Sequence, residues 1–421
     1  MLSITVPSEI RKVADRFKST VDMPFGSLCA FFAMHLFGCS TLCDAARHIA
    51  WSPSVSCLDS ALHKFSCNRF MRRVRGGILK KLKDRLNAED FCFAVDDTVV
   101  ERFGKKIFRI GTWGKHGNGQ MVRGQRIMVL ALIDRVRGVA IPLAFEVCPR
   151  KNDAEYKTGH ATALGLIKCV LDEGFPSLTT VFDSWFDSVS LMDELEKLGV
   201  TYVIEAKQNR LVKRCAAPGA KWRNWKQVIH KRIKRGVKIT PTENTKKHLG
   251  TRYIAEGCVF FRNRTSTLKA AAVYNNPTDG KFFSVYVSND LSMSGATMWG
   301  FARSRWHLEE TFRALKQNLS FAKIPASGKA ATELTVSIPF ALLTSIILEP
   351  EMWTSRSKVT IGSIVSEFRE QALTKTLEEF EKHSHRPNIL KLKCRRKTDR
   401  NNKKPVNPTA NEIKEWLSSA A

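Results

Sequence analysis

The sequence lacks the cysteine patterns that mark zinc-binding and disulfide-stabilised proteins. Its 11 cysteines are odd in number and scattered, and no two of them are spaced C-x-x-C. The nearest pair, Cys39 and Cys43, is followed by no pair of histidines at zinc-ligand spacing. Scattered free thiols are typical of a reducing compartment, so neither a zinc site nor a disulfide framework is expected.

Long hydrophobic runs are also missing. The longest apolar stretch, residues 338–348, is too short to span a bilayer and contains Pro339. The opening apolar stretch, residues 1–7, is followed at once by charge and does not resemble a secretory signal. We therefore expect a buried helix at 338–348, no membrane association and a cytoplasmic location.

Acidic residues are scarce compared with basic ones. The chain has 40 Asp and Glu against 68 Lys and Arg, which gives a net charge of +28. A charge of this size indicates the kind of partner rather than the fold. Nucleic acid is the commonest polyanion, since each neutralised phosphate releases bound counterions. A membrane surface, an acidic protein or no polyanionic partner at all stay open as alternatives.

The first part of the chain has the pattern of short helices. Residues 1–88 carry apolar side chains at helical spacing, and the segment 70–86 alternates basic and apolar positions with the same period. Such helices suit a helix-turn-helix type of DNA contact, although a helical bundle with a solvated charged face fits equally well. We interpret residues 1–88 as a helical DNA-binding domain.

The pattern changes after residue 88. Over residues 89–207 a group of strands precedes alternating helix and strand, which predicts a mixed sheet with helices packed on its faces. Residues 208–285 interrupt this alternation and form a predicted β-rich insertion. Residues 286–350 return to the core with a long helix at about 294–317, and residues 351–421 form a helical and basic tail.

Three acidic residues occupy informative positions in these elements. Asp96 and Asp183 each follow a short apolar strand, and the carboxyl ends of neighbouring strands can converge. Glu309 lies on the predicted long helix, four residues after Arg305 and seven before Lys316, so these three share one helical face. Carboxylate oxygens are the ligands that Mg²⁺ prefers, and nearby Arg and Lys can hold DNA phosphates.

Each of these signals also has a structural explanation. An aspartate at a strand end often caps a turn, and Glu309 with Arg305 could be an ordinary surface ion pair. The first acidic position is itself ambiguous, because Asp96 and Asp97 point to opposite faces of an extended strand and only one should bind metal. The residues alone leave both open, and the family resemblance given in the next paragraph favours Asp96.

Taken in order, the acidic segments resemble the D-D-E transposases of bacterial insertion sequences, a cut-and-paste family with a ribonuclease-H-like core. The similarity covers roughly residues 90–350. The segments that carry it are Val95-Asp96-Asp97-Thr98, Val181-Phe182-Asp183-Ser184-Trp185-Phe186, Tyr202-Val203-Ile204-Glu205-Ala206-Lys207-Gln208-Asn209, and Arg305-Trp306-His307-Leu308-Glu309 followed by Lys316. The tyrosine of the family signature is replaced by Ala302, which puts a hairpin route of excision in doubt but not the metal chemistry.

The resemblance implies a fold, an activity and partners. The expected fold is α/β: a ribonuclease-H-like mixed sheet flanked by helices, with an N-terminal helical domain and a β-rich insertion. Asp96, Asp183 and Glu309 would hold two Mg²⁺ ions, for which Mn²⁺ can substitute, and would cleave and join DNA. The expected partners are double-stranded DNA, as terminal inverted repeats and target, and a second copy of the chain in a paired-end complex near the bacterial nucleoid. A transposase-derived DNA-binding protein without catalysis, or a nuclease that cuts without joining, are the alternatives.

Several residues are candidates for contact with DNA. Trp222 and Trp225 lie among basic residues, where they could stack on a base or pack in the core of the insertion. The candidate DNA-binding residues are Lys115, Arg126, Lys207, Trp222, Trp225, Arg303, Arg305, Arg313 and Lys316.

Overall fold

A computed structural model shows two compact units. It describes residues 4, 6–50, 52–104, 106–114, 120–215, 219–225, 227–228, 240–242, 252–275, 282–321, 323–324, 327–354 and 360–384. The helical unit consists of Met1–Lys81, Glu101–Ile110 and Phe312–Ala421, and the sheet unit of Leu82–Val100 and Gly111–Thr311. Lys115 and the basic tail from residue 385 onward lie outside the described residues.

The helical unit is built around an apolar helix. Its helices are α1 (Ser8–Asp15), α2 (Phe25–Phe37), α3 (Leu42–His48), α4 (Val55–His63), α5 (Cys67–Leu82), α11 (Lys329–Leu348), η2 (Pro350–Met352) and α12 (Ile361–Ser384). Helix α11 packs against α2, α4 and α12, and most of its side chains are buried on every face. The buried helix expected at 338–348 is therefore confirmed.

Among the described residues, α11 is the one helix with the length and composition of a membrane span. The helices α2 and α3 reach that threshold only as a pair bent by 98°. Of the apolar window in α11, 89% is buried inside the protein, as in the core helix of a globular unit.

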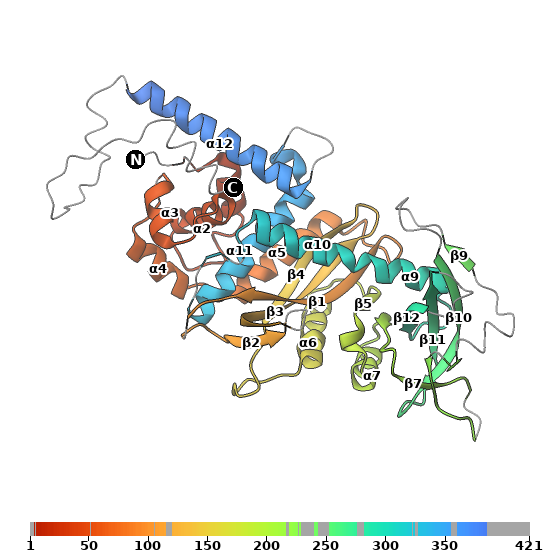
Figure 1. The fold of residues 1–421 in the computed structure, drawn as a ribbon. Coiled ribbons are helices and arrows are strands. Elements are labelled where there is room, and N and C mark those ends of the chain that lie inside the picture. The colour runs from red at the N-terminus through yellow and green to blue at the C-terminus, as the bar shows by residue number, and fades with distance from the viewer. Residues whose placement is uncertain are drawn as a thin grey trace. The chain divides into compact units, whose positions relative to one another are not determined.

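The sheet unit contains one large mixed sheet (Figure 1). Its strands are β1 (Phe91–Glu101), β2 (Gly111–Gly114), β3 (Met121–Asp134), β4 (Val139–Val147), β5 (Thr180–Phe182), β6 (Tyr202–Glu205), β7 (Leu211–Lys213), β8 (Arg223–Asn224), β9 (Thr240–Thr242), β10 (Arg252–Phe261), β11 (Leu268–Tyr274) and β12 (Phe282–Ser288). The order is β2-β3-β1-β5-β6-β12-β11-β10-β7-β8, with β4 on β3 and β9 on β10. The expected mixed sheet is thus confirmed.

Three parallel strands at the centre set the positions of the acidic residues. Strand β5 pairs in parallel with β1 on one side and with β6 on the other. These central strands are strongly apolar, as expected for strands covered on both faces. Helix α6 (Gly159–Asp172) packs on β3 and β4, and α9 (Gly295–Ser304) packs on β6, β11 and β12.

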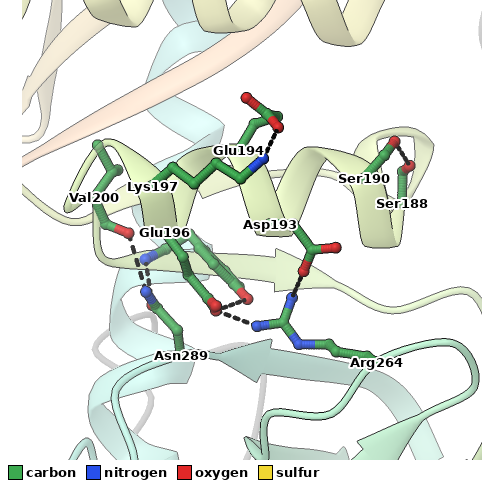
Figure 2. A network of polar contacts seen from close by, with 10 residues as sticks. Ser188, Ser190, Asp193, Glu194, Glu196, Lys197, Val200, Arg264 and Asn289 are labelled. Carbon is green, nitrogen blue, oxygen red and sulfur yellow. Dashed lines mark hydrogen bonds and ion pairs between the residues drawn. The ribbon is translucent and has the colours of Figure 1, made fainter.

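The strands of the insertion continue this sheet. Strand β12 pairs antiparallel with β6, so β10 and β11 are added beyond the central strands rather than forming a separate layer (Figure 1). The insertion is also fastened to helix α7 (Val189–Lys197) by Arg264, which follows β10 and bonds to Asp193 and Glu196 (Figure 2). The Arg264 side chain is only 1% exposed, so this contact belongs to the interior.

The long helix expected at about 294–317 is interrupted. It consists of α9 and of α10 (Trp306–Asn318), with Arg305 between them. The Ser304 hydroxyl donates to the Gly300 carbonyl at 2.9 Å, and such back-bonding bends helices. Sequence periodicity does not register this kind of break, because the apolar positions continue on either side.

Candidate active site

The first acidic residue lies within strand β1, not at its end. The strand continues from Asp96 to Glu101, whereas the neighbouring β5 stops at Phe182. Asp96 therefore lies just beyond the part of β1 that pairs with β5. Its side chain is 10% exposed, and Asp96 Oδ1 accepts a hydrogen bond from the Asp97 amide at 2.8 Å.

The second acidic residue is level with the first. The parallel register pairs Ala94 with Val181, so Asp183 directly follows β5 opposite Asp96. Asp183 caps the short helix η1 (Ser184–Phe186), since its Oδ1 accepts the Trp185 amide at 2.9 Å. Asp183 therefore caps a turn, and it also lies at the carboxyl end of a central strand, level with Asp96.

The third acidic residue reaches the same place through an arginine. Arg305 donates from Nη1 to Asp96 Oδ2 at 2.5 Å and from Nη2 to Glu309 Oε1 at 2.8 Å. One guanidinium thus joins strand β1 to the first turn of α10. The sequence alone could relate Arg305 to Glu309 by helical spacing, but it could not show that the same guanidinium binds Asp96.

Negative charge accumulates around this guanidinium. Burial raises the pKa of the Asp96 carboxyl to about 7; the Arg305 charge opposes that shift, and Asp183 and Asp97 add to it. Burial also raises the pKa of Glu205, where Arg305 lowers it and Asp183 raises it. One arginine therefore serves several carboxylates in a poorly solvated place.

Glu205 is the site residue that the sequence interpretation missed. Strand β6 pairs Val203 with Val181, so Glu205 is level with Asp183 just as Asp183 is level with Asp96. An alignment of the three parallel strand ends in the sequence would have found it.

Asp97 has a different role from Asp96. Its carboxylate forms a two-bond ion pair with Arg126, from Nε at 2.7 Å and from Nη2 at 2.9 Å. The same guanidinium lies over the Trp185 ring, with 4.5 Å from Cζ to the ring centroid. Asp97 is thus committed to Arg126, which supports Asp96 as the metal-facing member of the pair.

The donor set suits hard divalent cations. Asp96, Asp183 and Glu309 offer carboxylate oxygens, the ligands of Mg²⁺ and Mn²⁺. Within the described part of the chain, no three His, Cys, Asp or Glu side chains are already gathered as a metal cluster. Arg305 is bonded between Asp96 and Glu309 and supplies the positive charge there. The residues therefore fit a divalent cation by their chemistry, provided that the guanidinium yields its place.

The other candidates for DNA contact are spread over the sheet unit and helix α10. Lys207 lines a cleft of about 620 Å³ together with Arg210 and Arg262. Arg303 lies 5.9 Å from the Trp299 ring centroid. Arg313, which is exposed, and Lys316 lie further along α10.

The two tryptophans of the insertion differ. Trp225 is 1% exposed and packs edge-on against Phe261 with 6.0 Å between ring centroids. Its position corrects the prediction that it faces DNA and bears out the packing alternative. Trp222 is partly exposed, and the Lys213 ammonium lies 5.0 Å from its ring centroid.

Comparison with known proteins gives two findings. A family model described as a transposase DDE domain matches residues 89–344, which is more than half of the chain. Among solved structures, the cryo-EM structure of a piggyBac transposase synaptic complex with hairpin DNA aligns with a TM-score of 0.45 and 13% identity, over 99% of this chain and 82% of that one. No curated protein sequence matches significantly.

Proposed function

Because this chain belongs to the family of transposase DDE domains, we propose that it is a metal-dependent DNA transposase. It binds the terminal inverted repeats of its own element, cleaves the DNA at those ends and joins the freed 3′-hydroxyl to target DNA. The net charge of +28 supports a nucleic-acid partner, since phosphate contacts supply much of the affinity of such proteins.

The observation that carries this proposal is the convergence of three distant carboxylates. Asp96 and Asp183 are level on adjacent parallel strands, and Arg305 bonds Asp96 and Glu309 at once. A surface ion pair would need only Arg305 and Glu309. The inclusion of a buried strand aspartate supports a functional site rather than an ordinary ion pair on the helix surface.

Asp96, Asp183 and Glu309 would hold two Mg²⁺ or Mn²⁺ ions. When bound, such ions activate the attacking oxygen and stabilise the leaving oxygen of the phosphodiester. Asp97 keeps Arg126 beside the site. With Asp96 and Glu309 holding cations, Arg305 would be available to bind a DNA phosphate, which the planar guanidinium suits.

The proposed assembly is a homodimer on two paired DNA ends in the bacterial cytoplasm, associated with the nucleoid. The family resemblance supports this proposal, and mass photometry of the chain with end DNA would measure the stoichiometry of the complex. One mass corresponding to two chains and two DNA ends would support the proposal, and a single chain per DNA end would contradict it.

The test is cleavage of a labelled DNA that carries the ends of the element, in Mg²⁺, by wild type, Glu309→Gln and Glu310→Gln. Glu310 is a matched control because it neighbours Glu309 on α10 but pairs with His307 instead of Arg305. We expect cutting by wild type and Glu310→Gln, and a loss of roughly 10²-fold or more for Glu309→Gln with DNA binding retained. Equal cutting by all three would remove Glu309 from the site. Binding without cutting by any of them would favour a DNA-binding protein without catalysis.

A further inference from the structure

A half-open tryptophan stands directly beside the second carboxylate. Trp185 lies in η1, and its amide donates to Asp183 Oδ1, so the position of the ring is tied to that of the carboxylate. Trp185 is 37% exposed, whereas the next residue, Phe186, is fully buried. The exposed ring is therefore specific to this position and not a general feature of the turn.

The Trp185 indole packs against Gly159, where there is no room for a larger residue. A Cβ built on Gly159, at the start of α6, would lie 2.0 Å from Cη2 of Trp185. A Cβ on Gly165, in the same helix, would meet nothing within 4 Å. Because a contact of 2.0 Å is sterically forbidden, any side chain at residue 159 would displace the ring.

Two further contacts hold the ring in this orientation. The Arg126 guanidinium lies over it and is itself fixed by both oxygens of Asp97. Phe186 meets it edge-on, with 4.9 Å between the ring centroids. A large apolar surface is thus kept partly in solvent, beside the carboxylates, by contacts from three separate segments of the sheet unit.

We propose that Trp185 is a base-stacking platform that receives an unpaired base of the DNA strand next to the scissile phosphate. This inference rests on the proposed function. A phosphodiester inside a duplex is flanked by stacked bases, and extruding one of them is unfavourable unless the protein offers an alternative surface. An indole provides such a surface for any base, because each base has a π face. The platform would favour frayed or single-stranded ends without reading their sequence.

The test compares binding to two DNA probes in buffer without divalent cations, where metal-dependent cleavage does not compete. One probe is a blunt duplex, and the other is the same duplex with a short single-stranded overhang that carries 2-aminopurine at its first unpaired position. We expect wild type to prefer the overhang and to quench the 2-aminopurine. Trp185→Ala should lose roughly 5- to 150-fold of that preference together with the quenching, and Trp185→Phe should keep most of both.

Matched variants separate stacking from folding. Gly159→Ala should lose the preference although Trp185 is still present, and Gly165→Ala should retain it. Trp306, another exposed tryptophan, provides a second comparison. A lost preference in Trp306→Ala with an unchanged preference in Trp185→Ala would overturn the inference, as would the absence of any overhang preference in wild type.

Failure of this inference is distinguishable from failure of the proposed function. Wild type that cuts end DNA in Mg²⁺ but ignores the overhang would retain the function and lose the platform. Wild type that stacks the overhang through Trp185 but never cuts would retain the platform and lose the function.

Discussion

Two arginines of the sheet unit each bridge two carboxylates, yet their surroundings differ. Arg264 joins the insertion to α7 through Asp193 and Glu196, and its side chain is 1% exposed (Figure 2). Arg305 joins β1 to α10 through Asp96 and Glu309, and its side chain is 21% exposed. In the first bridge the arginine is buried and its two acids are partly exposed. In the second bridge the most buried member is an acid, Asp96.

The two bridges differ in which member of the ion pair is buried and therefore needs the opposite charge of its partner. Arg264 is the buried member of its bridge, so its carboxylates are needed to hold it in the interior. At the other bridge Asp96 is the buried member, and Arg305 lies close enough to Asp183 and Glu205 as well to act on their negative charge. The Arg264 bridge is therefore a structural ion pair of the interior, and the Arg305 bridge is a place where further cations are favoured.

Removing the two acids of the Arg264 bridge should have the largest effect on the free energy of unfolding. In Asp193→Asn with Glu196→Gln, the buried Arg264 guanidinium is left without a counter-charge. We expect a loss of about 2–3 kcal/mol in the free energy of unfolding, less than for fully buried pairs because both acids are partly exposed. Urea unfolding measures it. Glu194→Gln, on the same helix but paired with exposed Lys197, is the control and should leave the unfolding free energy unchanged.

Removing Asp96 from the candidate site should change the free energy of unfolding in the opposite direction. At pH 8 without metal, the Asp96 carboxylate is ionised in a place that raises its pKa, so ionisation opposes folding there. Asp96→Asn should raise the unfolding free energy by about 1–2 kcal/mol while abolishing cleavage. Asp97→Asn should lower it, because Arg126 loses its partner. Destabilisation by both variants would show that the site has no surplus of negative charge.

A buried histidine, His35, provides a third case, and among the described residues its hydrogen-bond partner is a carbonyl and not a carboxylate. Burial lowers the pKa of His35 in α2 to about 3, the Leu319 carbonyl partly offsets the shift, and the Arg102 charge adds to it. The folded protein keeps this ring neutral, whereas the unfolded chain binds a proton below about pH 6.5. Stability from the neutral ring is fully present above pH 6.5 and is lost as the pH falls toward 3.

The size of this effect follows from linkage. The difference in unfolding free energy between wild type and His35→Gln should shift against wild type by about 1 kcal/mol over the first pH unit below 6.5. Urea unfolding at a series of pH values measures it. A difference that stays constant over that range would mean that His35 is protonated in the folded state.

Much of the site could be predicted because its pieces are local patterns. Asp96 and Asp183 each follow a short apolar run in the sequence, and Glu309 shares a helical face with Arg305, and the apolar pattern and helical spacing identify these features. Their registration could not be predicted in the same way. It depends on Ala94 pairing with Val181, a tertiary contact between segments far apart in the sequence.

The residues that were missed or misplaced depend on such contacts as well. The ion pair between Arg126 and Asp97 joins two strands and could not be read from the sequence, while the contact of Arg126 with DNA stays a prediction. Trp225 looked like a stacking residue because its sequence neighbours are basic, although β-strand packing buries it. The break at Arg305 follows a bond from the Ser304 hydroxyl to the Gly300 carbonyl, a contact that no apolar pattern encodes.

The most direct test of the central claim, that Asp96, Asp183 and Glu309 together hold divalent cations, is Mn²⁺ binding measured by electron paramagnetic resonance. We expect wild type and Glu310→Gln to bind Mn²⁺ alike, and Asp96→Asn, Asp183→Asn and Glu309→Gln each to bind it at least about tenfold more weakly. Unchanged Mn²⁺ affinity in all three variants would contradict the assignment of these carboxylates as the metal site.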